Sequence, residues 1–444
     1  MDKYTQMTET PVRRLVTRLA VPTVISMLVT TFYNMADTYF VSRLNNTSAT
    51  GAVGVVFPLM AFIQAVGFFF GQGSGNFISR SLGAGEDERA KRMSSTGFYS
   101  SLAAGILIAL TGFIILKPLA YILGATDTIY PFARDYLAVI LLGTPFICCS
   151  FVLNNQLRFQ GNAAFAMVGI MTGAILNCIL DPLLIEVVGM GVTGAAAATS
   201  VSQAVSFFLL LIGCRRSGGV FPKIKYFTPR REYFFAMFNG GAPSLARQGI
   251  AAVASVLMNI VGGSFGDYAI TAMTVCSKIT MFFNSAMIGF GQGFQPVCGF
   301  NYGAGKYDRV KKAFWFSVRV TFIFLLILSG VGIAFSRQLV SVFSDDPLVI
   351  GFGIPALRFM CISFPFNSFT VMSNMLMQTI GKGVRATIVA VTRQGLALMP
   401  IMLILWRFFG AAGFQSSQMW ADFAAFLISI PLTVSVLREM KTEG

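Results

Sequence analysis

The sequence contains no histidine, and this absence excludes several classes of chemistry. Without an imidazole side chain, the 444-residue chain cannot form a Ser-His-Asp triad, a histidine-ligated zinc site or an imidazole proton relay. It also lacks the G-x-x-x-x-G-K-[ST] pattern, so it does not bind ATP through a P-loop. The seven cysteines show no C-x-x-C spacing and are expected to be small packing residues. We therefore predict no enzymatic centre, no metal site and no cofactor.

Charged residues are also scarce. They make up 11% of the chain, whereas soluble proteins carry about 25%. Hydrophobic residues reach 55%, and the mean hydropathy is +0.71. This composition excludes a soluble enzyme, a secreted disulfide scaffold and a disordered chain. Because a membrane-spanning helix needs roughly 20 mostly apolar residues, the chain is predicted to be an all-α, multi-pass membrane protein.

Hydropathy predicts twelve membrane-spanning helices, in two bundles of six. Several of them contain proline, which frees a backbone carbonyl and bends a helix. Pro22, near the start of the first helix, is the expected bend. The predicted helices lie near residues 19–43, 49–79, 94–116, 133–157, 163–186, 190–213, 233–262, 267–299, 313–335, 348–379, 384–406 and 412–437.

The basic residues predict the orientation, because loops rich in Lys and Arg remain on the cytoplasmic side. If both termini are cytoplasmic, the cytoplasmic segments contain 23 of the 33 basic residues and the outer loops contain five. This bias accounts for most of the net charge of +15 without any nucleic-acid partner. We expect a bacterial cell (inner) membrane protein with both termini in the cytoplasm.

An internal repeat divides the chain into two halves. Residues 71–92 and 291–312 align without gaps at an offset of 220, with eight identities in 22 positions. We therefore predict an N-terminal lobe at 1–213, a basic cytoplasmic linker at 214–231 and a C-terminal lobe at 232–444. Six spans in each lobe give both lobes the same orientation, an arrangement that suits alternating access. Further matched pairs are Asn154 with Asn374, Gly161 with Gly381, and, at an offset of 219, Gly191 and Gly194 with Gly410 and Gly413.

Three segments together resemble the multidrug and toxic compound extrusion (MATE) transporters. They are FYNMADTYFVSRL in the first span, the GQG…GAG-x-x-x-R-x-K loop after the second, and ILNCILDPLLI in the fifth. The resemblance implies export of drugs or organic cations through a cleft between the lobes, driven by H⁺ or Na⁺ antiport. It also implies an ion site in the N-terminal lobe. The expected partners are these small molecules and membrane lipids, and the chain is expected to act as a monomer.

Asp37 is the first candidate for the ion site. A carboxylate inside a membrane is costly and indicates function by default. Tyr33 and Asn34 lie four and three residues earlier, so both can share its helix face and line a substrate cleft.

Asn177 and Asp181 are four residues apart in the fifth span, so their amide and carboxylate converge on one helix face. Carboxylate, amide and hydroxyl oxygens suit Na⁺ or a shared proton, and Thr199 in the sixth span is a candidate for the hydroxyl. In the resembled family, positions that correspond to Asp37 and Asp181 bind the coupling ion, with Asn177 and Thr199 beside them. The C-terminal half does not repeat these acids in its seventh and tenth spans, so no second sodium site is expected there.

The remaining cleft candidates are polar, flexible or basic side chains within predicted spans. Amides in a membrane favour a cavity, and methionine adapts to varied ligands. The basic residues either line the cleft or contact lipid phosphates. The candidates are Gln64, Asn154, Asn155, Gln248, Asn284 and Asn374, then Met281 and Met287, then the basic residues Arg247, Lys278 and Arg393.

Two alternative functions are compatible with these residues. A lipid or lipid-linked saccharide flippase of the same superfamily would use a cation-rich cleft, for which Arg247, Lys278 and Arg393 are available. An intramembrane enzyme would use Asp37 and Asp181 as paired acids. Independently of function, Gly83 and Gly303 in the repeated loop are expected to adopt backbone angles open mainly to glycine.

Overall fold

The computed structural model describes residues 3–42 and 47–440, and within these ranges every regular element is helical. Exposed helix faces are rich in large apolar side chains, as expected where lipid rather than water surrounds a protein. The elements of the first half are α1 (Lys3–Glu9), α2 (Val12–Ser42), α3 (Thr47–Gly83), α4 (Asp87–Ile114), α5 (Leu116–Ile122), α6 (Tyr130–Phe159), α7 (Ala163–Pro182), the π-helix η1 (Leu183–Val187), α8 (Gly191–Arg216) and the short η2 (Ile224–Tyr226).

The second half repeats this order with small changes. Its elements are α9 (Arg231–Gly263), α10 (Asp267–Gly303), α11 (Tyr307–Ala334), α12 (Ser336–Ser341), α13 (Pro347–Thr379), α14 (Gly383–Val391), the π-helix η3 (Thr392–Leu396) and α15 (Leu398–Glu439). The short helices α5 and α12 were not predicted, and both directly follow a long helix.

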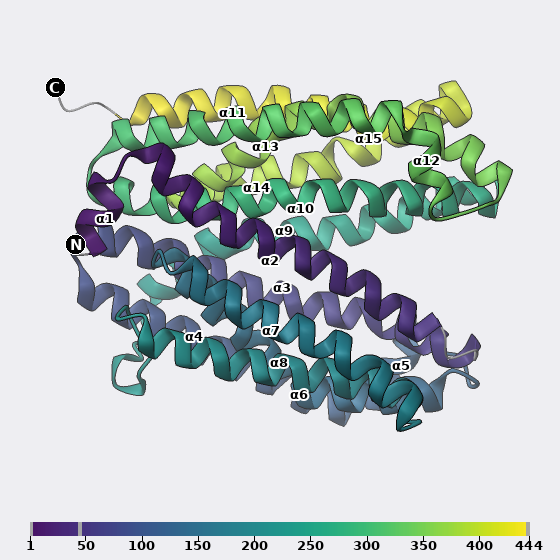
Figure 1. Cartoon of the computed structure of the whole chain (residues 1–444), viewed down its shortest axis with the longest axis horizontal. Helices are drawn as coiled ribbons and strands as arrows, with labels where there is room; N and C mark the ends of the chain where they lie inside the picture. The colour runs from purple at the N-terminus through teal and green to yellow at the C-terminus, as the bar shows by residue number, and fades with distance from the viewer. Residues whose placement is uncertain (1–2, 43–46, 441–444) are drawn as a thin grey trace. The chain divides into compact units, whose positions relative to one another are not determined.

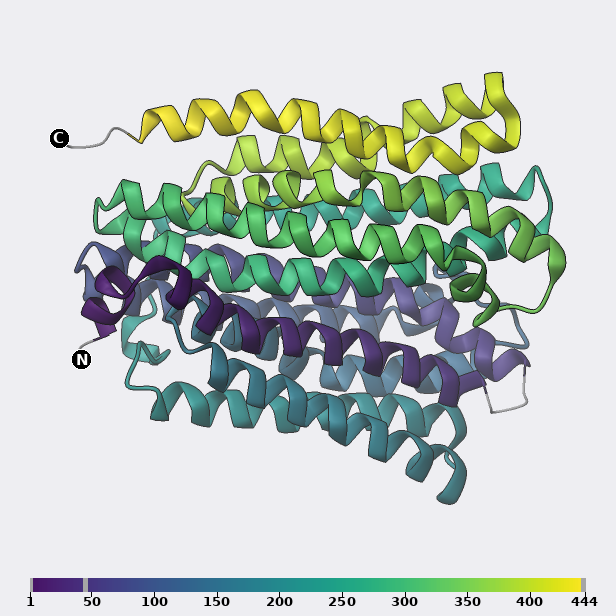
Figure 2. The same ribbon diagram turned by 45° about the horizontal axis from the view of Figure 1, so that its top comes forward.

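The twelve predicted spans are confirmed once two details are taken into account. Ten described segments are long and apolar enough to cross a membrane, and one of them, Gly383–Glu439, comprises α14, η3 and α15 and covers two predicted spans. The chain doubles back within this segment (Figure 2). Gly410, whose φ of 56° is positive, interrupts the helical backbone of α15. The 37-residue α10 is not among the ten apolar segments, yet it takes the place of the eighth predicted span.

The described residues form two compact units. The N-terminal unit comprises residues 25–241, and the C-terminal unit comprises 1–24 together with 242–444. The boundaries fall inside α2 and α9, whereas the repeat predicts a boundary in the linker 214–231. The starts of these two helices therefore belong to a different unit from their remainders.

In the N-terminal unit, α6 is the central helix. It packs against α3, α4, α7 and α8, which run beside it (Figure 1). About two thirds of its most apolar stretch is buried (67%), against 28–39% for its four neighbours. The linker joins this unit through Gln160, which exchanges two hydrogen bonds with the backbone of Val220 at 2.6 and 3.1 Å.

In the C-terminal unit, α13 has the central position and packs against α10, α11, α14 and α15. The start of α2 also belongs to this unit and approaches α10 closely, since a Cβ at Gly293 would lie 2.3 Å from the Cα of Ala20. The start of α9 makes the equivalent approach in the N-terminal unit. A Cβ at Gly73 would lie 2.3 Å from the carbonyl oxygen of Met237.

The structural details follow the sequence repeat. Asn154 donates to the carbonyl of Ala166 at 3.2 Å, and Asn374, 220 residues later, donates to that of Ala386 at 2.6 Å. Positive φ angles recur in matched glycine pairs, which indicates that the two halves share their turns as well as their helices. The pairs are Gly85 and Gly305 (75° and 73°), Gly161 and Gly381 (80° and 86°), and Gly191 and Gly410 (58° and 56°).

The prediction for Gly83 and Gly303 is wrong. Both are the last residues of long helices, α3 and α10, and the positive φ angles occur two residues later, at Gly85 and Gly305. The helices extend further than hydropathy alone indicates, so the chain reverses only after they end.

Candidate functional site

A buried polar group joins α7 to α8 in the N-terminal unit. Asn177 and Asp181 lie one turn apart on α7, and Thr199 approaches them from α8. The Nδ2 atom of Asn177 donates to Asp181 Oδ1 and to Thr199 Oγ1, at 3.4 Å each. All three side chains are buried, and Asp181 is entirely enclosed. The structure therefore brings together three of the four residues predicted for the ion site.

Small residues allow α7 and α8 to approach so closely. A Cβ at Gly169 would lie 2.5 Å from side-chain carbons of Leu210, and one at Gly173 would lie 3.0 Å from the Cβ of Ser206. The hydroxyl of Ser206 also donates to the carbonyl of Gly169 at 2.9 Å. Glycine and serine at a helix interface bring backbones near each other in a membrane, where packing replaces the hydrophobic effect. The polar group thus lies on a rigid helix pair.

The hydrogen bonds inside the group are long, and one of its oxygens has no donor. Hydrogen bonds between N–H and O are usually about 2.9–3.0 Å long, so both bonds of Asn177 are weak. Its Oδ1 atom is buried and has no hydrogen-bond partner among the described residues. Asp181 is followed by Pro182 and the π-helix η1, a helix type found often at functional sites. Carboxylate, amide and hydroxyl oxygens can accept a proton or a hard cation together.

The fourth predicted ligand, Asp37, belongs to α2, but its side chain lies outside the described residues. Nearby on the same helix, Tyr33 is half-buried and Asn34 is exposed. The helix is continuous through Pro22, where a bend was predicted.

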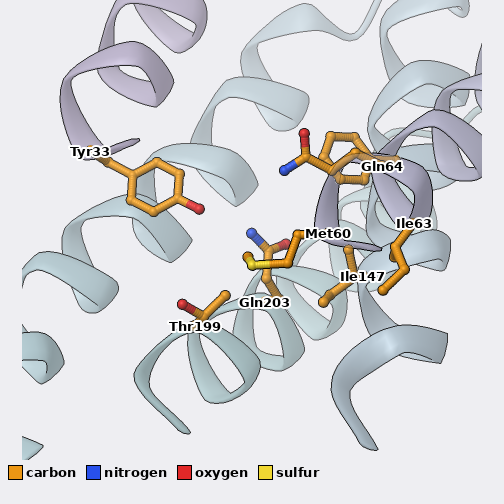
Figure 3. A pocket seen from close by; sticks show the side chains of 8 residues that line it. Tyr33, Met60, Ile63, Gln64, Ile147, Thr199 and Gln203 are labelled. Atoms are coloured by element: carbon orange, nitrogen blue, oxygen red, sulfur yellow. The ribbon is translucent and has the colours of Figure 1, made fainter. Parts of the chain in front are cut away.

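A pocket in the N-terminal unit includes Thr199, so it borders directly on the polar group. Tyr33, Gln64 and Gln203 contribute their polar ends to the same space (Figure 3). Tyr33, Gln64 and Thr199 were among the predicted site residues, whereas Gln203 was not. Gln203 lies one turn after Thr199 on α8, and this i, i+4 spacing is the signal that could have identified it. The apolar part of the wall consists of Met60, Ile63, Ile147 and Phe151.

Three of the predicted cleft residues instead connect helices. Asn154 and Asn374 donate to backbone carbonyls of the following helix. Asn155 is fully buried, and its Oδ1 accepts hydrogen bonds from Gln72 at 3.1 Å and from Arg158 at 2.7 Å. A buried amide must find partners, and here α6 itself and the neighbouring helices supply them rather than a substrate cavity.

The other predicted cleft residues lie in the C-terminal unit. Lys278 and Met281 are exposed on α10, while Met287 on the same helix is completely buried. Asn284 is half-buried, and its Oδ1 has no hydrogen-bond partner among the described residues. Gln248 on α9 is half-buried too.

The last of them, Arg393, has a partner that the sequence analysis missed. Its Nε donates to Asp422 Oδ1 at 2.8 Å, and Asp422 is only 1% exposed. Asp422 lies within the twelfth predicted span, where an acid is costly and therefore informative. The expectation of no acidic site in the C-terminal half rests on the seventh and tenth spans, and Asp422 lies in neither.

A family model described as MatE matches residues 22–183 and 243–404, one segment in each half. The chain belongs to the MatE family. Its relatives include the multidrug export protein MepA of Staphylococcus saprophyticus, 27% identical over 424 residues, with 95% of this chain and 93% of that protein covered. MepA of Staphylococcus aureus strain NCTC 8325 is 28% identical over 437 residues, covering 98% and 96%.

Solved structures give the same result for the fold. An outward-facing multidrug resistance MATE family transporter superimposes with a TM-score of 0.93 at 26% identity, over 99% of both chains. The family predicted from the sequence is thereby confirmed, and this MatE protein is a multi-pass membrane transporter. Of the three cations that the flippase alternative would use, Arg393 forms an ion pair with Asp422 through its Nε atom.

Proposed function

We propose that this MatE protein is a secondary active exporter that moves amphipathic drugs, including organic cations, out of a bacterial cell in exchange for H⁺ or Na⁺. The proposal rests on Thr199, which belongs both to the pocket and to the buried polar group. This side chain lines the pocket with Tyr33 and Gln64, and it also accepts a hydrogen bond from the amide that contacts Asp181. An ion at the acid and a drug in the pocket would therefore share one wall.

The shared wall supplies a mechanism for exchange. When Asp181 takes up a proton or Na⁺, the weak bonds of Asn177 rearrange, and Thr199 moves with them. The pocket then changes shape and releases the drug, so ion and drug binding oppose each other by linkage. Asp37, which the family resemblance places beside Asp181, would complete the ion site. The excess of basic residues in the proposed cytoplasmic segments supports an inner-membrane location with both termini inside. We assign the monomer as the transporting unit.

Reconstitution into liposomes tests this proposal. Efflux of ethidium, driven by an imposed pH or Na⁺ gradient, is the assay. We expect Asp181→Asn and Asp37→Asn to abolish gradient-driven efflux, because neither amide can take up the coupling ion. Asp267→Asn, the same substitution at an exposed acid, is the control and should transport normally. Wild-type rates in Asp181→Asn under the same gradient would remove this residue from the mechanism.

Separate gradients identify the coupling ion. Thr199→Val keeps the shape of the side chain and removes its oxygen. If Na⁺ is the ion, this variant should lose Na⁺-driven efflux, since hard cations require oxygen ligands. If H⁺ is the ion, pH-driven efflux should be reduced but not lost in Thr199→Val, because the variant keeps the proton acceptor at Asp181 and loses the hydrogen bond from Asn177. It should disappear in Asp181→Asn. Ethidium binding in detergent should then weaken as the pH is lowered in the wild type, and this dependence should be flat in Asp181→Asn.

A further inference from the structure

Two arginines belong to one polar site in the C-terminal unit. Arg247 lies on α9 and Arg393 on the π-helix η3. These elements touch, since a Cβ at Gly395 would lie 2.5 Å from Cγ2 of Ile250. Ile250 is one turn from Arg247 on the same helix, and Gly395 is two residues from Arg393. The two arginines therefore lie on contacting stretches of α9 and η3.

Arg393 is held in place by a buried network. Its Nε donates to Asp422 Oδ1 at 2.8 Å, and Gln418 donates to the same oxygen at 3.1 Å. Ser363 and Asn367 donate to Asp422 Oδ2 at 2.7 and 2.9 Å. This network fixes the side chain through Nε alone. The two terminal nitrogens of Arg393 make no hydrogen bond with the described residues, and the side chain is 19% exposed.

Arg247 supplies the second cation. It is half-buried, and it makes no hydrogen bond or ion pair with any residue that the structure describes. Two arginines and one aspartate give the site a net charge of +1. An uncompensated positive charge inside a membrane is costly and indicates a function. The observed geometry, one anchored guanidinium beside a second, calls for an anion as the missing partner.

We propose that Arg247 and Arg393 bind the carboxylate group of an amphipathic substrate. Guanidinium groups present paired N–H donors that match the two oxygens of a carboxylate. The π-helical turn that carries Arg393 is of a type that recurs at functional sites. The proposal rests on the proposed export function and extends its substrates from cations to zwitterionic and anionic drugs. The C-terminal unit would then bind the anionic group of a substrate, and the N-terminal unit would bind the coupling cation.

A pair of dyes that differ by one ester group provides the test. Rhodamine 110 carries a free carboxylate, and rhodamine 123 is its methyl ester. Binding of each dye to purified protein in detergent is followed by fluorescence anisotropy, without any gradient. We expect Arg247→Gln to weaken rhodamine 110 binding by about tenfold, the effect of one lost hydrogen bond between charged groups. Binding of rhodamine 123 should change by less than about twofold.

Three further measurements make the result decisive. Arg319→Gln, at an exposed arginine of α11, should leave both affinities unchanged. Because Arg393→Gln alone leaves Asp422 buried without its cation, the double variant Arg393→Gln/Asp422→Asn replaces it and should also lose affinity selectively for rhodamine 110. Phosphatidylglycerol is added to the micelles to compare a lipid headgroup with the dye. Displacement of rhodamine 110 by this lipid would overturn the assignment to a substrate.

An equal loss of both dyes in Arg247→Gln, or no loss of either, would overturn the proposal as well. The export function is checked separately, by efflux of rhodamine 123 under a gradient. Failure of that efflux with intact carboxylate selectivity in binding would refute export and leave the anion site standing.

Discussion

The ion pair between Arg393 and Asp422 should stabilise the C-terminal unit measurably. Removing one partner of a buried pair costs about 3–5 kcal/mol, because a charge is left without compensation. Arg393 is 19% exposed, so water partly hydrates it when Asp422 is neutralised, and the lower end of this range applies. We therefore expect Asp422→Asn to lower the free energy of unfolding by about 3 kcal/mol. Arg393→Gln should cost about the same, because the buried carboxylate that it leaves keeps the donors of Ser363, Asn367 and Gln418.

The double variant separates charge pairing from hydrogen bonding. It contains no unpaired charge, but the donors of Ser363, Asn367 and Gln418 now share one amide oxygen instead of a carboxylate. An amide oxygen accepts two hydrogen bonds, so one of the three donors and the new amide NH2 group lack an acceptor. Two donors without an acceptor cost about 1–1.5 kcal/mol each, so the double variant should also lose about 3 kcal/mol. The two single effects would sum to about 6 kcal/mol, which leaves a coupling energy of about 3 kcal/mol.

The cysteines of the chain provide the assay. Six of the seven cysteines are buried, among them Cys276, Cys298 and Cys361 in the C-terminal unit, so a thiol-reactive coumarin gains most of its fluorescence when the protein unfolds on heating. We expect a lower midpoint for each single variant and a double variant about as stable as either one. Asp267→Asn, at an exposed acid, should melt as the wild type does. A double variant whose midpoint falls by the sum of the two single shifts would refute the pairing argument.

Three further substitutions test the repeated turns and a repeated hydrogen bond between helices by the same melting assay. Gly305→Ala should lower the free energy of unfolding by about 1 kcal/mol, because φ is +73° and no atom obstructs the new methyl group. An unchanged melting midpoint would show that this φ angle causes no backbone strain in alanine. Gly413→Ala should destabilise the protein far more and reduce the yield of folded protein, because its Cβ would lie 2.0 Å from the carbonyl oxygen of Leu405. Normal expression of this variant would contradict the prediction. Asn374→Ala should cost about 1 kcal/mol through the lost 2.6 Å bond to Ala386, and a loss of dye binding without a change in stability would instead place the amide in the cleft.

Periodicity and hydropathy predicted the membrane-spanning helices, because the membrane dictates the length and composition of these helices. A helix that crosses lipid must be apolar for its whole length, so the spans were readable from the sequence. The spacing of Asn177 and Asp181 likewise fixed their convergence, since residues four apart share a helix face. Their contact with Thr199 depends on how α7 meets α8, and here the family resemblance provided the prediction.

The sequence could not decide what a buried amide contacts. Asn154 and Gln64 are both amides within spans, yet Asn154 bonds a neighbouring backbone and Gln64 lines a pocket. Polarity predicts that such a side chain needs a partner, but the partner depends on the packing of other helices. The error at Gly83 has a simpler cause. The glycine pattern suggested a reversal at Gly83, but the α-helix continues to this residue and the positive φ angle occurs two residues later, at Gly85.

The boundaries between the two compact units fall inside α2 and α9, and this affects whether the protein can be made as two separate fragments. A break in the linker 214–231 would yield two polypeptides that match the sequence repeat. Each would keep a helix start that belongs to the unit built by the other, residues 3–24 in one case and 231–241 in the other. Neither fragment is thus a complete folding module. Stable protein should require both fragments to be made in the same cell, where each can supply the segment the other lacks.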